Sequence, residues 1–177
     1  AAGDTNAVAD RLRGANVLLN TPNNHAELTN NTDSITGFDF MDGIEIGADT
    51  RTNWSSGTYV SWMWKRAPGY FDAVAFTTQA SGYYKSFNHN LTVAPEMIWL
   101  KNRPNSDPWL VYHSALGLSN YLVLNSGAAE ATEASWMDAP SATQVTGIKD
   151  NLTYNNSEYI AYLFASLPGI SKVGSYT

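Results

Sequence analysis

The chain has 177 residues, of which 12% are aromatic and only 15% are charged, and its formal net charge is −6 at pH 7. This length allows one sizeable hydrophobic core and is short for two full domains. With Lys65-Arg66 as the longest basic run, the charge excludes the positive surface that binds a nucleic-acid backbone. The absence of Cys excludes disulfides and thiolate zinc sites, and no apolar run is long enough for membrane insertion.

In chain order, the first expected element is a short helix from Ala7 to Ala15, which Asp4 or Thr5 can cap. Every later element is predicted to be a short strand, because β-branched and aromatic residues alternate between turn signals. The clearest strand is Thr58 to Trp64. Both of its faces are apolar, which is typical of a strand between two layers or at a protein interface.

The other predicted strands are Val17 to Leu19, Gly43 to Ile46, Phe71 to Thr77, Met97 to Lys101, Trp109 to Tyr112, Tyr121 to Leu124, Tyr159 to Phe164 and Ser171 to Tyr176. Many short strands with frequent turns predict an all-β fold, a jelly-roll-like β-sandwich with at most one or two short helices.

The sequence also contains an internal two-fold repeat. A shift of 100 positions aligns identical residues without a gap: Gly47 with Gly147, Tyr59 with Tyr159, Pro68-Gly69 with Pro168-Gly169, and Thr77 with Thr177. Upstream the match continues with a small shift, so an insertion falls near Thr36 to Asp42. Only the second copy has a leading portion, Asn90 to Arg103. We predict one sandwich domain, with copy one at about 1–77 and copy two at about 78–177, as a fragment of a longer or processed chain.

No arrangement of residues predicts an enzyme. His25, His89 and His113 share no metal-ligand spacing, and no Ser lies in a G-x-S-x-G turn. We therefore expect no catalytic residue, no metal site and no cofactor.

The carboxylates offer one alternative. Four of them lie close together in sequence: Asp39, Asp42, Glu45 and Asp49. Grouped acids can hold calcium or cleave a glycoside. The competing interpretation is an acidic edge in contact with solvent.

The densest mixture of polar tips and aromatic rings follows the strand that begins at Met97. It contains Asn102, Arg103, Trp109 and His113. An aromatic ring can cover the C–H face of a sugar while amide and guanidinium groups bond its hydroxyls. These four residues are the candidate ligand-binding site. The structural alternative is that the charges block edge pairing and that Trp109 belongs to the core.

Six segments carry a resemblance to a known family: Tyr59 to Lys65, Val93 to Arg103, Trp109 to His113, Leu116-Gly117, Tyr159 to Ala165 and Lys172 to Thr177. They resemble a repeated β-sandwich domain of tailed-bacteriophage virion proteins, of the tail-fibre type found in phages of marine bacteria. The resemblance implies a concanavalin-like sandwich on the extracellular surface of the virion, and it brings no catalytic residues with it.

The function that follows from this resemblance is a virion structural module, part of a tail fibre or surface appendage used in host attachment. Its expected partners are other virion proteins and a host surface polysaccharide. One alternative is a capsid decoration or head-fibre protein. Another is an enzyme that degrades envelope polysaccharide, which would need two carboxylates facing each other in a groove. A homotrimer is the expected assembly if the apolar strand forms a subunit interface.

Overall fold

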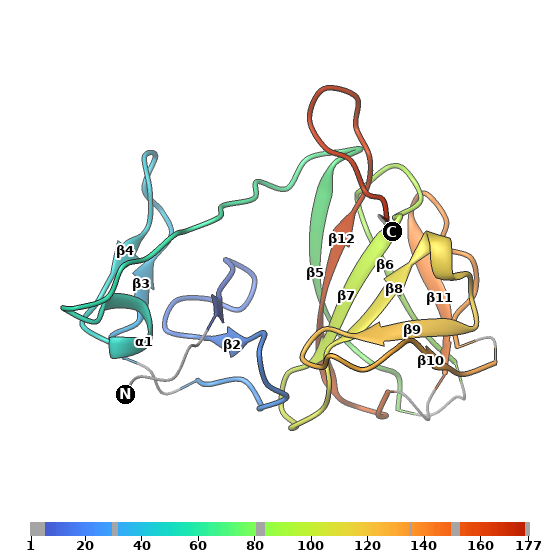
Figure 1. The fold of residues 1–177 in the computed structure, drawn as a ribbon, viewed down its shortest axis with the longest axis horizontal. Helices are drawn as coiled ribbons and strands as arrows, with labels where there is room; N and C mark the ends of the chain where they lie inside the picture. The colour runs from blue at the N-terminus through green and yellow to red at the C-terminus, as the bar shows by residue number, and fades with distance from the viewer. Residues whose placement is uncertain (1–5, 30–31, 81–83, 135, 150–152, 176–177) are drawn as a thin grey trace.

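The computed structural model describes residues 6–29, 32–80, 84–134, 136–149 and 153–175. Its main feature is a six-stranded antiparallel sheet in the order β10-β9-β8-β7-β12-β5 (Figure 1). The strands of this sheet are β5 (Phe71–Thr77), β7 (Met97–Asn102), β8 (Leu110–His113), β9 (Asn120–Val123), β10 (Ala131–Thr132) and β12 (Glu158–Phe164). A second sheet pairs β6 (Tyr84–Asn88) with β11 (Gln144–Lys149). The expected all-β sandwich is confirmed.

Strand β12 lies between β7 and β5 and is buried on both faces. Tyr159, Ala161 and Leu163 belong to the core shared with β6 and β11. Ile160 and Tyr162 belong to a second core on the opposite face. Alternate residues of a strand point to opposite faces, so a strand with a core on each side must be apolar throughout.

The second core is closed by the N-terminal segment. There β1 (Ala7–Val8) pairs with β2 (Leu19–Asn20), and Leu19 belongs to the same core cluster as Phe71 and Trp109. The indole Nε1 of Trp109 donates a hydrogen bond to the Asn20 carbonyl at 2.9 Å. The N-terminal segment therefore forms a third layer over the large sheet.

The elements that follow lie apart from the large sheet. They are β3 (Ile35–Gly37), β4 (Glu45–Ile46) and the four-residue helix α1 (Thr50–Asn53). Figure 1 shows a long extended stretch of chain that runs from α1 to β5. The strand predicted from Thr58 to Trp64 lies in this stretch, and that prediction is wrong: these residues are extended but pair with no strand in the described part of the chain.

The predicted helix from Ala7 to Ala15 is wrong. Residues 7 and 8 form β1, and the chain then turns because the Asp10 carboxylate accepts hydrogen bonds from the backbone N–H groups of Leu12 and Arg13, each at 3.0 Å. Gly14 follows with φ +92°, a conformation that glycine adopts without strain. A local side-chain-to-backbone turn here replaces the helix.

The predicted strands of the large sheet are confirmed within one residue at each end, and Phe71 to Thr77 matches β5 at both ends. Val17 to Leu19 and Gly43 to Ile46 are only partly strand, as β2 and β4. Beyond an isolated bridge at Ser171, residues 172–175 join no strand in the described part of the chain. Tyr176, the last residue of that prediction, lies outside the described residues.

The repeat recurs in the contacts. The Tyr59 hydroxyl accepts a hydrogen bond from the Trp54 N–H at 2.7 Å, and the Tyr159 hydroxyl accepts one from the Tyr154 N–H at 2.9 Å. A bridge joins Ala67 to Phe71, and another joins Leu167 to Ser171. Both contacts are related by a shift of 100 positions.

Upstream, the shift between the two copies is 103 positions. Val8 pairs with Leu19 in the first copy, and Val111 pairs with Leu122 in the second. The backbone N–H of Asp49 donates to the Asp33 carbonyl, and the backbone N–H of Lys149 makes the corresponding hydrogen bond to the Trp136 carbonyl. The first pair is three residues further apart in sequence than the second, so the three additional residues of the first copy lie between Asp33 and Asp49. The insertion predicted near Thr36 to Asp42 falls within this interval.

Candidate interaction surface

Two of the four predicted ligand-binding residues are inside the protein. Trp109 is fully buried, with its ring stacked against Tyr162 and its indole N–H bonded to Asn20. Asn102 is buried as well, and its amide donates to the Tyr159 hydroxyl at 3.0 Å. Neither residue presents a face on which a sugar could lie.

The other two residues, Arg103 and His113, make hydrogen bonds within the protein at two separate places. The Arg103 guanidinium binds the Glu27 carboxylate through Nη2 at 2.8 Å and through Nε at 3.0 Å. His113 accepts the Ala115 N–H at 3.1 Å and so begins a short 3-10 turn, Ser114–Leu116. His113 lies opposite Met97 in the β7–β8 hairpin, at the other end of β7 from Asn102. The structure therefore does not bring the four residues together as one surface patch.

Sequence reasoning missed a buried charge network beneath the large sheet. Arg13 binds Asp10 at 2.6 Å and Glu27 at 3.2 Å, and it donates to the Tyr162 hydroxyl at 3.2 Å. Tyr162 in turn donates to Asp10 at 2.7 Å. These contacts join the N-terminal segment to β12, across more than 130 residues of sequence, so no local pattern could have predicted them.

The ionisation of this network is fixed by its partners. Burial would raise the pKa of Asp10, but the Arg13 charge and the hydrogen bonds from Tyr162 and Arg13 outweigh it, so this pKa lies below its usual range. Burial raises the pKa of Tyr162. A paired carboxylate and a neutral phenol, both already bonded, favour a structural role for the network.

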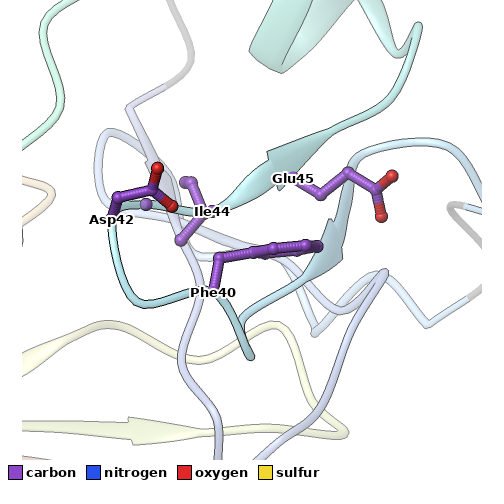
Figure 2. A pocket seen from close by; sticks show the side chains of 5 residues that line it. Phe40, Asp42, Ile44 and Glu45 are labelled. Carbon is purple, nitrogen blue, oxygen red and sulfur yellow. The ribbon is translucent and has the colours of Figure 1, made fainter.

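The four acidic residues of the first copy also spread out. Asp39 pairs with Arg11, and Asp49 pairs with Arg51 at 2.9 Å. Asp42 and Glu45 line an open hollow of about 260 Å³ together with Phe40, and Figure 2 shows their carboxylates pointing in different directions. Among the described residues, no three His, Asp or Glu side chains gather closely enough to hold a metal ion.

The most unusual surface is the extended stretch before β5. We call Tyr59, Val60, Trp62, Met63 and Trp64 the apolar strip. The exposed fraction is 76% for Val60, 78% for Trp62 and 66% for Met63. Large apolar side chains gathered on a surface are typical of a protein contact site.

The backbone of the strip is unpaired as well. No hydrogen bond joins the backbone of residues 58–65 to another described residue. The two ends are held: the Tyr59 hydroxyl donates to the Thr50 carbonyl at 3.2 Å, and the Trp64 ring centroid lies 6.0 Å from that of Phe71. An extended, anchored segment with free N–H and C=O groups can accept another strand.

The fold and this surface define a class, an internally repeated all-β module with an unpaired apolar strip. The chain belongs to the family described as Domain of unknown function (DUF7483), which matches residues 1–177. No curated protein and no solved structure matches it. Across the described residues, no helix has the length and apolar character that a membrane crossing requires.

Proposed function

We propose that this chain is a structural module of a virion appendage, part of a tail fibre or a similar surface structure, and that it works without catalysis. The observation that carries the proposal is the origin of β5. This strand belongs to the first repeat copy, yet it completes the large sheet of the second copy by pairing with β12. The two copies are therefore joined by a shared sheet.

The shared sheet suits a component that carries load. All seven residues of β12 pair with β5, from Glu158 opposite Thr77 to Phe164 opposite Phe71. Separating the copies requires breaking this whole ladder. Repeats whose neighbours share structure gain stability from each interface, so the arrangement favours a rigid linear element.

Two further observations support the proposal. Arg13 and Arg103, whose pKa values are raised, both pair with Glu27 and so join separate segments of the fold. The segments that resemble tailed-bacteriophage virion proteins include β12, the strand through which the second copy receives β5. Because Trp109 and Asn102 are buried, we do not assign host-glycan recognition to the four residues predicted from the sequence.

The test is to find the chain on particles. Antibodies raised against the purified chain would be used for immunogold electron microscopy of phage particles whose genome encodes it, with antibody pre-absorbed on the purified chain as the control. We expect gold on the tail appendages. Gold over the capsid shell would instead identify the chain as a capsid decoration protein. Particles free of gold, and free of the chain by mass spectrometry, would overturn the virion assignment.

A further inference from the structure

The apolar strip is the repeat counterpart of β12. Tyr59 makes the same hydrogen bond to the residue five positions earlier as Tyr159 does. The remaining positions conserve size and apolar character: Val60 corresponds to Ile160, Trp62 to Tyr162, Met63 to Leu163 and Trp64 to Phe164. The two segments thus have the same kind of sequence.

Their surroundings differ completely. β12 has β7 on one edge and β5 on the other, whereas the strip has no strand on either edge within the described part of the chain. Leu163 is fully buried, while its counterpart Met63 is 66% exposed. The strip therefore has the sequence of a central strand and the position of an unpaired one.

The C-terminal segment is the complementary case. Residues 171–175 are the counterpart of the first five residues of β5. They follow the same turn, since Gly69 and Gly169 have φ of +73° and +77° and the Ala67–Phe71 and Leu167–Ser171 bridges correspond. In the first copy, the strand after this turn is β5, which pairs with β12 in the sheet of the second copy. The second copy has the same turn, and residues 172–175 then follow it without a strand partner among the described residues.

We propose that residues 171–175 of a second copy of this chain add as an antiparallel strand to the apolar strip. The β12–β5 ladder supplies the register. By the repeat, Trp64 faces Ser171 of the second copy, Trp62 faces Val173 and Val60 faces Ser175. Because donor and acceptor are different surfaces, each copy can accept one strand and donate another, and such a head-to-tail contact builds an open chain of copies. This inference rests on the proposed structural role and names its partner.

Sedimentation of the full chain over a range of concentrations tests the proposal. The acceptor is blocked by Ser61→Pro and the donor by Gly174→Pro, since proline cannot donate to a ladder. These two residues form a hydrogen-bonded pair in the proposed ladder, in the alternation set by the Ala165–Tyr70 and Thr78–Ser157 hydrogen bonds between the segments of β12 and β5. Ala129→Pro is the matched control, at an exposed position outside every strand. We expect the average mass of the wild type and of Ala129→Pro to rise with concentration to several times the monomer mass, and each blocked variant alone to remain a monomer.

Mixing the two blocked variants is the decisive step. Ser61→Pro retains a donor and Gly174→Pro retains an acceptor, so their equimolar mixture should form dimers of one copy of each and nothing larger. Non-specific apolar association would not stop at two chains. A wild type that stays monomeric, or one whose assembly survives both substitutions, would overturn the proposal.

Disulfide trapping tests the register independently of the proline variants. The chain has no Cys, so an introduced pair reacts without background. Ser61→Cys mixed with Gly174→Cys should give a mixed disulfide, because these residues face each other in the proposed ladder. Lys172→Cys, two positions away on the same face, is the control and should give several-fold less. Equal yields would contradict the register.

The outcome is separable from that of the proposed function. Head-to-tail assembly in solution with no gold on particles would keep the strand exchange and remove the virion role. A monomer in solution with gold on the tail would do the reverse.

Discussion

At the scale of single residues, Glu27 has the most demanding position. Its carboxylate lies between Arg13 and Arg103 and is itself buried. The Arg13 side chain is fully buried too. A buried charge is tolerated only when it is paired, because removing water from it is costly.

We predict that Glu27→Gln lowers the free energy of unfolding by about 3 kcal/mol, since it leaves Arg13 with one carboxylate for a buried charge. Asp39→Asn makes the same chemical change at a pair whose Asp39 side chain is 96% exposed, and it should cost less than about 1 kcal/mol. Urea unfolding of both variants measures the difference. Equal losses would mean that the Glu27 cluster contributes no more than a surface pair.

Lys101 predicts a pH dependence. Its buried Nζ donates to the carbonyls of Asn102 at 2.5 Å and Asn105 at 2.9 Å. Burial lowers the pKa of Lys101 to about 8, although the negative charges of Asp107 and Glu27 act to raise it. Above this pH the folded chain carries a neutral lysine, while the unfolded chain stays protonated until its ordinary pKa of about 10.4. The unfolded state then binds the additional proton, so the free energy of unfolding rises with pH in this window.

We expect the wild type to gain stability between pH 8 and 9.5 relative to Lys101→Met, which cannot titrate. Urea unfolding at several pH values measures the two curves. The series stops at 9.5 because burial raises the pKa of Tyr159 to about 12, and a raised tyrosine pKa reduces stability once the unfolded chain ionises near pH 10. Parallel curves for the two proteins would contradict the prediction.

At the scale of elements, the repeat supplies a matched pair of strands. Leu163 of β12 is fully buried, and Leu163→Ala should cost about 2–5 kcal/mol because it removes packed methyl groups and leaves a cavity. Met63 occupies the same repeat position in the apolar strip, and Met63→Ala should change stability by about 0.5 kcal/mol or less. Urea unfolding at low protein concentration compares them as single chains. Similar losses would show that the strip is packed.

The same pair shows what local sequence encodes. The strands of the large sheet were predictable because β-branched and aromatic residues lie between clear turns. The strip was predicted as a strand for the same reason, and it is extended, but a strand also needs a neighbour, and the strip's own residues cannot specify one. β6 and β11 escaped prediction because polar residues such as Lys85, Ser86 and Gln144 obscure their alternation.

The candidate site failed to assemble for a related reason. Arg103 and His113 are close in sequence, but the hairpin between them sends His113 to the far end of β7. Trp109 is buried by a contact with Asn20, 89 residues away. Such long-range contacts depend on the whole fold, whereas the aromatic and polar composition of the segment described only its local chemistry.

At the scale of the whole molecule, a single extended connection joins two parts that also touch through side chains. The N-terminal part supplies Leu19 to the second core and Arg13 and Glu27 to the charge network. The part from residue 67 onward holds every strand of the large sheet and the β6–β11 pair. The connection itself is exposed around Lys65 and Arg66. A cut there leaves in place the core contacts of Leu19 and the ion pairs of Arg13 and Glu27.

We predict that trypsin cleavage after Lys65 or Arg66 leaves the two fragments associated. They should elute together in gel filtration, with masses that identify the cut, and separate only in concentrated urea, because Leu19 and the buried ion pairs hold them without the covalent link. The same cleavage of Glu27→Gln should release the N-terminal fragment at a lower urea concentration. A wild-type N-terminal fragment that elutes alone in buffer would show that the connection, rather than the packing, keeps the N-terminal layer on the large sheet.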